Sequence, residues 1–141
     1  MKTNNEYKMF IKKSELCNAV FLMNKDVDLV AIINKNGRVI ESKFAKDTDL
    51  SRLSDSQLEM IVMQRSLQTT MMKEFDQNLS PFHQTIVMRE SHVEFVCNLD
   101  EEILLIISNV NVDIKQFSTN VSSSVSGFHT PTPNVMAVQH A

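Results

Sequence analysis

The sequence predicts an α+β domain in which a five-stranded antiparallel sheet, in strand order 2-1-5-4-3, carries helices on both faces. Three observations predict this α/β sandwich: an Asn-Gly turn between two strand-like runs, a well-capped long helix, and three closely spaced strand-like segments after Pro81. The first and last strand-like runs are apolar throughout, which is typical of central strands covered on both sides. Placing those two strands at the centre gives the order above.

Length and composition indicate a single domain followed by a tail. The chain has 141 residues, of which 43% are apolar and 22% charged, as in ordinary globular domains. We expect residues 1–117 to form the domain. Ser, Thr, Asn and Pro dominate residues 118–141, so that segment is expected to be a flexible tail.

A first helix is predicted over residues 6–23, where apolar residues recur near helical spacing without Gly or Pro. A β-hairpin should follow, because residues 29–33 and 38–44 are strand-like and Asn36-Gly37 lies between them. A two-residue type I′ turn needs φ > 0 at both central residues, which Asn-Gly supplies. It would pair Ile33 with Ile40. The second strand is polar on one side and is therefore predicted to be an edge strand.

The long helix is predicted over residues 54–79. Ser54 and Gln57 have the spacing of a capping box, and Pro81 stops the helix. One apolar stripe comprises Leu58, Ile61, Val62, Thr69, Met72, Phe75 and Leu79. Four further apolar residues widen it, namely Met60, Met63, Leu67 and Met71. The surface is wider than one sheet face requires, so either a second layer or another subunit covers these four.

Three strands are predicted after the helix, over residues 84–89, 93–97 and 103–107. Short turns join them, so we expect an antiparallel meander. A short last helix is predicted over residues 113–117. The acids at Asp100, Glu101 and Glu102, and Glu94 beside the preceding turn, are expected to be solvated.

Residue types argue against most catalytic chemistry. Gly37 and Gly127 are the only glycines, so neither of the glycine-rich loops that bind nucleotide phosphates is present. The histidines lack metal-site spacing, and Cys17 and Cys97 are expected to be buried free thiols. A nucleophile set of Cys97 with His92 and Asp100 is the remaining catalytic alternative. The sequence predicts no enzyme and no catalytic, cofactor-binding or metal-binding residues.

Charge and hydropathy limit the binding partners and the cellular compartment that we expect for this protein. The formal net charge is −3, and Lys and Arg do not form the clusters that nucleic-acid binding requires. No window approaches the ~18 uninterrupted apolar residues of a membrane span. Few cysteines and a polar N-terminal segment lead us to expect a cytoplasmic protein with no nucleic-acid or membrane partner.

The order of elements resembles the roadblock/LC7 family of the profilin-like superfold. The resemblance rests on the hairpin around Asn36-Gly37, the helix of residues 54–79 and the three strands that follow. It covers about residues 6–117. Residues 58–108 also look like uncharacterised small archaeal proteins assigned to that superfold.

This resemblance implies a non-enzymatic module for protein interaction and homodimerisation, of a type that often regulates or scaffolds small GTPases. Such proteins commonly dimerise through the long helix and the third strand. Carried onto this chain, the dimer interface would comprise Met60, Met63, Leu67, Met71, Thr85 and Val87. No cofactor is implied. The alternative is a small-ligand sensor of PAS- or profilin-like architecture, with a ligand cavity between sheet and helix.

Overall fold

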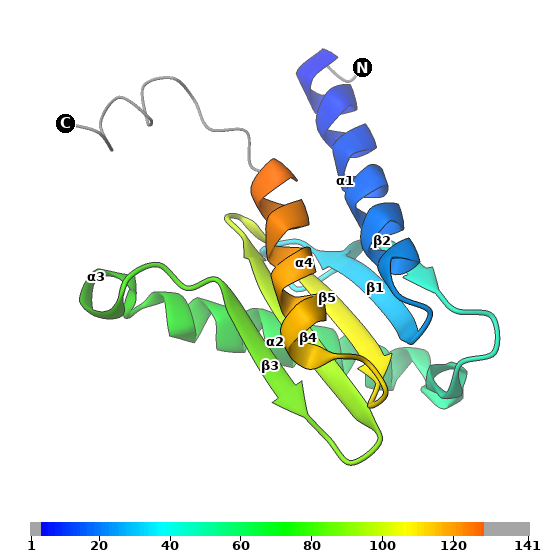
Figure 1. Ribbon diagram of the computed structural model, residues 1–141. Helices are drawn as coiled ribbons and strands as arrows, with labels where there is room; N and C mark the ends of the chain where they lie inside the picture. The colour runs from blue at the N-terminus through cyan, green and yellow to red at the C-terminus, as the bar shows by residue number, and fades with distance from the viewer. Residues whose placement is uncertain (1–3, 129–141) are drawn as a thin grey trace.

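A five-stranded antiparallel sheet in the order β2-β1-β5-β4-β3 forms the centre of the computed structural model, which describes residues 4–128 (Figure 1). The elements are α1 (Asn4–Met23), β1 (Val27–Ile33), β2 (Val39–Phe44), the 3-10 helix η1 (Asp49–Arg52), α2 (Asp55–Lys73), α3 (Asp76–Leu79), β3 (Gln84–Met88), β4 (His92–Leu99), β5 (Glu102–Asn109) and α4 (Ile114–Phe128). Helices α1 and α4 cover one face and α2 covers the other. The predicted fold class and strand order are confirmed.

Each face of the sheet carries its own apolar core. Alternation along β1 sends Val30 and Ile32 toward α1 and α4, whereas Leu29, Ala31 and Ile33 face α2. On the α1–α4 side, the rings of Phe95 and Phe117 meet edge to face with centroids 4.9 Å apart. Strands β1 and β5 are buried on both sides, as their apolar runs predicted.

The hairpin turn differs from the predicted type I′ turn. The Asn34 N–H donates to the Arg38 carbonyl at 2.9 Å and the Gly37 N–H to the Asn34 carbonyl at 2.9 Å. Gly37, at φ +77°, is the only turn residue with positive φ. The loop is therefore a three-residue type I turn with a bulge at Gly37. Asn34 Oδ1 stabilises it by accepting from the Asn36 and Arg38 N–H groups. Ile33 pairs with Val39 and not with Ile40.

The long helix is shorter than predicted, because α2 ends at Lys73 and α3 is a separate turn. The Lys73 ammonium donates to the Asp100 carbonyl at 2.5 Å, which places the end of α2 at the β4–β5 turn. Beyond that turn there is no sheet to pack against. Met72, Phe75 and Leu79 are accordingly exposed, so a reading of the whole apolar stripe as facing the core is wrong for these three residues.

The last helix is longer than predicted. It runs to Phe128, so the expected flexible tail is wrong for residues 118–128, while residues 129–141 lie outside the described part of the chain. Phe117 and Val121 are buried and Val125 packs beside them. This four-residue spacing gives the helix an apolar face whose packing outweighs the modest helix propensity of its serines. Within residues 4–128, no helix is both long and apolar enough to cross a bilayer.

Candidate protein-interaction surface

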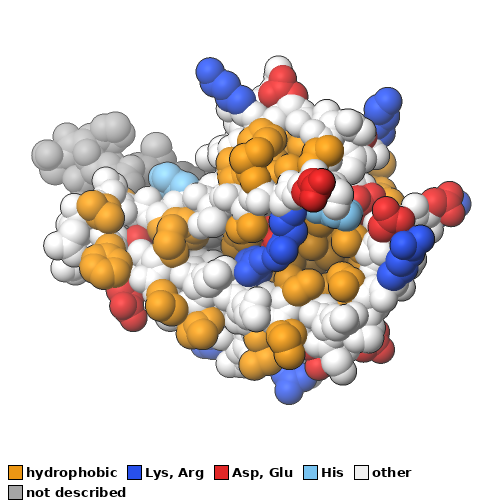
Figure 2. All heavy atoms as spheres, turned by 90° about the horizontal axis from the view of Figure 1, so that it is seen from below, with side chains coloured by type: hydrophobic (Ala, Val, Ile, Leu, Met, Phe, Trp, Pro, Cys, Tyr) orange, Lys and Arg blue, Asp and Glu red, His pale blue; other side chains and the backbone are white. Residues whose placement is uncertain are grey.

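A row of large apolar side chains points away from the sheet on α2. Met60, Met63 and Leu67 are each 62% exposed and Met71 is 54% exposed. Their spacing of three or four residues places them on one helix face. The opposite face is buried through Val62, Arg65 and Thr69. Figure 2 views this side of the molecule, where apolar side chains spread across the face and most charged ones lie toward its periphery.

Strand β3 flanks this helix at the edge of the sheet. Thr85 and Val87 are half-buried, and they pair with Val96 and Glu94 of β4. Val96 belongs to the core beneath α2, so Thr85 and Val87 share that face of the sheet. The structure thus places the four helix residues and the two strand residues of the predicted interface on the same side of the molecule.

Two apolar residues of β3, within the strand of residues 84–89 that the prediction included, lie on the other face of the sheet. Ile86 and Met88 pair with Phe95 and Val93, whose side chains belong to the core on the α1–α4 side. Ile86 is 37% exposed and Met88 is 69% exposed. Strand β3 therefore presents accessible apolar side chains on the face opposite α2 as well.

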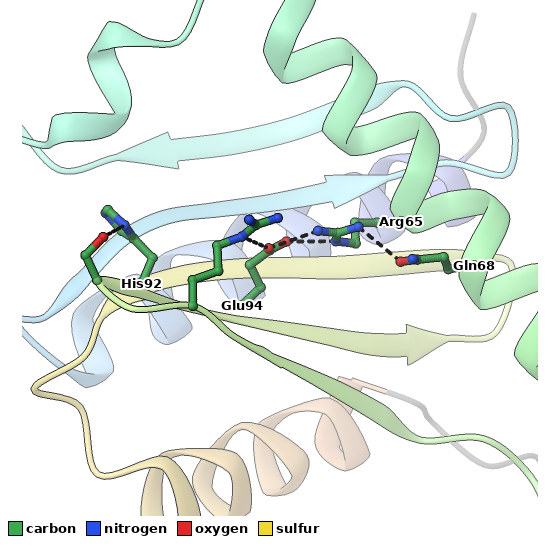
Figure 3. Close-up of polar contacts among 6 residues, drawn as sticks. Arg65, Gln68, His92 and Glu94 are labelled. Carbon is green, nitrogen blue, oxygen red and sulfur yellow. Dashed lines mark hydrogen bonds and ion pairs between the residues drawn. The ribbon is translucent and has the colours of Figure 1, made fainter.

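A buried ion-pair network lies between α2 and the strands (Figure 3). Arg65 Nε and Nη2 donate to the two carboxylate oxygens of Glu94 at 2.7 and 2.9 Å, and Nη1 donates to Gln68 Oε1 at 3.1 Å. Arg89, beside the end of β3, adds a bond from its Nε to Glu94 Oε2 at 3.2 Å. Arg65 is 5% exposed and Glu94 is 3% exposed. The network ties α2, β4 and the end of β3 together.

Both members of the central pair are charged. Burial by itself would raise the pKa of the Glu94 carboxyl, but the hydrogen bonds and charges of Arg65 and Arg89 outweigh it and lower that pKa. The hydrogen bonds to Glu94 raise the pKa of Arg65. A guanidinium that donates to both oxygens of a carboxylate fixes the relative orientation of the two side chains and also pairs their charges. The arrangement can hold α2 at a defined position on the sheet.

The expectation that Glu94 is solvated is wrong, and Arg65 was not considered. Both were accessible to pattern reasoning. Arg65 continues the inward helical spacing of Val62 and Thr69. Glu94 alternates with Val93 and Phe95, so it lies on the strand face that α2 covers. A buried carboxylate on that face requires a cationic partner from the helix.

The structure does not bring together the nucleophile set of Cys97, His92 and Asp100. Cys17 and Cys97 are buried free thiols, as predicted, and burial raises the pKa of each to about 11. His92 lies at the start of β4, and its side chain alternates to the face opposite Cys97. Within residues 4–128, no group of three or more His, Cys, Asp or Glu side chains is arranged to hold a metal ion.

A surface depression of about 390 Å³ lies between the hairpin tip and α2. Its lining mixes apolar and charged side chains, namely Asn36, Gly37, Arg38, Val39, Leu58, Glu59, Val62 and Met63. Farther under α2, the layer between helix and sheet is filled by buried aliphatic side chains. The depression therefore opens onto the surface beside Met63, not into the core.

Comparison with known proteins reveals similarity at the level of structure. No protein-family model and no curated protein matches the sequence. A roadblock/LC7 domain from Streptomyces avermitilis superposes with a TM-score of 0.63 at 11% identity, over 81% of this chain and 92% of that one. The gliding protein MglB from Thermus thermophilus superposes with a TM-score of 0.65 at 11% identity, over 91% and 93%.

A structure described as MglB with tetrameric arrangement gives a TM-score of 0.61 at 10% identity, over 91% of this chain and 92% of that one. At sequence identities this low, structural likeness shows only that the fold is shared. The sheet order and the surrounding helices of this chain match the roadblock/LC7 fold of these structures. The similarity to small archaeal proteins stays an expectation.

Proposed function

Starting from this shared roadblock/LC7 fold, we propose that the chain is a non-enzymatic module for protein interaction that acts as a homodimer. The observation that carries the proposal is the exposed row Met60, Met63, Leu67 and Met71, hereafter the α2 row. Soluble proteins that expose contiguous apolar surface of this kind generally use it for association. Methionine suits such a surface because its flexible thioether adapts to a partner.

The proposed interface joins the α2 row to the β3 residues Thr85 and Val87. The buried network links the two parts, since Arg65 and Gln68 belong to α2 and Glu94 pairs with Val87 across β3 and β4. A fixed angle between helix and strand keeps the two parts of the surface in one geometry. Preorganisation of this kind lowers the cost of association.

The ligand-sensor alternative has no comparable support. It requires a cavity between sheet and helix, and aliphatic side chains occupy that layer. They are Leu29, Ala31, Ile33, Val62, Val96, Ile103, Leu105 and Ile107. A ligand between sheet and helix would have to displace these buried side chains, since protein interiors are closely packed.

Dimerisation is tested by light scattering and sedimentation velocity on the full chain and on Met63→Glu and Met71→Glu. A charge placed in the α2 row should convert the dimer to a monomer, because an unpaired buried charge is strongly disfavoured. Asn120→Glu on α4 is the matched control, since residue 120 is exposed on the opposite side of the sheet. A monomeric wild type, or row variants that remain dimeric, would contradict the proposal.

We further propose that the dimer regulates or scaffolds a small GTPase. Support comes from the roadblock-type resemblance and from the structural likeness to MglB. Wild-type protein should capture a GTP-binding protein from native cell extract, with retention that differs between GDP and a non-hydrolysable GTP analogue. Met63→Glu, which lacks the dimer, is the control. Equal recovery of GTP-binding proteins by both baits would remove the GTPase from the proposal.

A further inference from the structure

The tip of the β1–β2 hairpin contains a chemically reactive pair of residues. Asn36 is the only asparagine in the sequence that is followed by glycine, since the other glycine, Gly127, follows Ser126. A glycine has no side chain to hinder its backbone nitrogen, so this nitrogen can approach the side-chain amide of the asparagine before it. Asn36 is also exposed, so water can reach the amide.

We propose that Asn36 is a site of deamidation and that the folded hairpin controls the rate. The Gly37 nitrogen loses its proton to hydroxide and bonds to Asn36 Cγ. The bond from Cγ to the side-chain nitrogen breaks, and ammonia leaves after taking a proton back from water. Water then opens the resulting succinimide ring at either carbonyl, which gives aspartate or isoaspartate. The net reaction consumes water and releases ammonia, with no change of oxidation state.

The observed turn disfavours the geometry that this reaction needs. The Gly37 N–H donates to the Asn34 carbonyl at 2.9 Å, so attack on Cγ requires that hydrogen bond to break. In a type I turn that begins at Asn34, Asn36 occupies the third position, where ψ is about 0°. Ring closure needs ψ far from this value, because the Gly37 nitrogen must swing toward the Asn36 side chain. The loop must therefore open before the amide is lost.

Two sets of contacts keep the loop closed. Asn34 Oδ1 accepts from the Asn36 N–H at 3.0 Å and from the Arg38 N–H at 3.1 Å. The tip also lies against α2, since a Cβ added at Gly37 would be 3.5 Å from Met63 Cγ and 3.8 Å from Met63 Cα. Local opening of such a loop is an equilibrium separate from global unfolding. Deamidation thus accumulates in proportion to the time that the loop spends open.

The products alter the hairpin tip in different ways. Both place a carboxylate at the depression that Asn36 and Glu59 line. Isoaspartate also routes the backbone through the former side chain, which adds a carbon atom between residues 36 and 37. A three-residue loop has no room for this atom while the Gly37 N–H reaches the Asn34 carbonyl. Isoaspartate in place of Asn36 should therefore release the tip from Met63. None of these steps depends on the proposed homodimer.

Peptide mapping by mass spectrometry on the full chain measures the reaction. At one pH, amide loss at Asn36 should be at least about tenfold faster in urea than in the folded protein, because the open loop is then always populated. In urea, Gly37→Ala should slow the loss at least about fivefold, since a Cβ hinders the attacking nitrogen. Equal rates with and without urea overturn control by the turn. Faster loss at another asparagine in urea, or no effect of Gly37→Ala, overturns the assigned site.

Variants of Asn34 test the turn in the folded state. Asn34→Ala removes the acceptor of two N–H groups and should speed amide loss at Asn36 at least about fivefold. Asn34→Asp keeps an acceptor oxygen and should retain the slow rate. Circular dichroism establishes whether both variants fold. A folded Asn34→Ala that reacts at the wild-type rate overturns the role of Asn34, and if that variant does not fold, the wild-type comparison in buffer and urea decides.

The effect on the tip is measured against Asn36→Asp, which carries the charge of the product without the added backbone atom. The isoaspartate form is separated from aged protein by ion exchange. Its Gly37 N–H should exchange hydrogen at least about tenfold faster than the same group in Asn36→Asp. Equal exchange in the two proteins overturns release of the tip.

Discussion

Arg65 and Glu94 form a bidentate ion pair between α2 and β4, with N–O distances of 2.7 and 2.9 Å and both side chains almost fully buried. Burying two charges costs desolvation free energy, so such a pair contributes little net stability. Removing only one partner, however, lowers stability strongly, because it leaves the other charge buried and unpaired. Its value here is geometric. The α2 row and β3 form one surface only while helix and strands keep their relative position.

Glu94→Gln should destabilise the fold by about 3–5 kcal/mol, because Arg65 remains buried without a counter-charge. Urea unfolding monitored by circular dichroism measures the change. The double replacement Arg65→Met with Glu94→Leu should recover most of that stability while it loosens the position of α2. If Glu94→Gln unfolds at the same urea concentration as the wild type, the network is not buried in solution.

The pH dependence of stability should carry a signature of Glu94. Its pKa is lower in the folded protein than the value of about 4.3 in an unfolded chain. The contribution of Glu94 is therefore complete above about pH 4.3 and is lost as the pH falls through the folded pKa. The difference in unfolding free energy between wild type and Glu94→Gln should shrink from pH 7 toward pH 3. A difference that stays constant over this range would contradict the charged state of the pair.

Gly37→Ala should destabilise the hairpin by about 1–2 kcal/mol, since a Cβ is disfavoured at φ +77°. The added carbon would lie 3.5 Å from Met63 Cγ, which is ordinary contact, so the cost is conformational. Gly37→Asn is the matched control, because Asn tolerates this region better than Ala. Thermal unfolding of the three proteins should rank Gly above Asn and Asn above Ala. An Ala variant at least as stable as the Asn variant would argue for a different turn.

Val121→Ala should lower the free energy of unfolding by about 2 kcal/mol, because this side chain is fully buried on the inward face of α4. The neighbouring Ser122→Ala, at an exposed position, should be nearly neutral. Chemical denaturation of the two variants tests whether residues 118–128 belong to the folded domain. Equal stability of the two variants would mean that residues 118–128 belong to a flexible tail, as their composition suggested.

The apparent melting temperature should rise with protein concentration for the wild type and not for Met71→Glu. Association with the folded state alone stabilises it by mass action. Differential scanning calorimetry over a hundredfold concentration range makes the comparison. A wild-type melting temperature that is independent of concentration would contradict the homodimer.

The parts of the fold that depend on local pattern were predictable from the sequence. The apolar runs of β1 and β5 placed them at the centre of the sheet, and the Ser54–Gln57 capping box marks the start of α2 in the structure. The turn type was not predictable from Asn36-Gly37 alone, because the side chain of Asn34 selects the observed loop.

Other features depend on contacts between distant segments. The end of α2 follows from where the sheet stops, which Lys73 and Asp100 define in the folded chain. The inward positions of Arg65 and Glu94 follow from sequence spacing, but their pairing depends on where α2 crosses β4. The serines of α4 obscured an apolar face whose partners lie on α1 and the sheet.

The exposed methionines make the α2 row sensitive to oxidation. Met60, Met63 and Met71 carry exposed thioethers, which peroxides convert to polar sulfoxides. Oxidation would therefore remove apolar character from this row and leave Leu67 as its only unmodified member. Reductases that repair methionine sulfoxide would restore it. Any association through the row is thus linked to cellular oxidant levels, although both cysteines are buried.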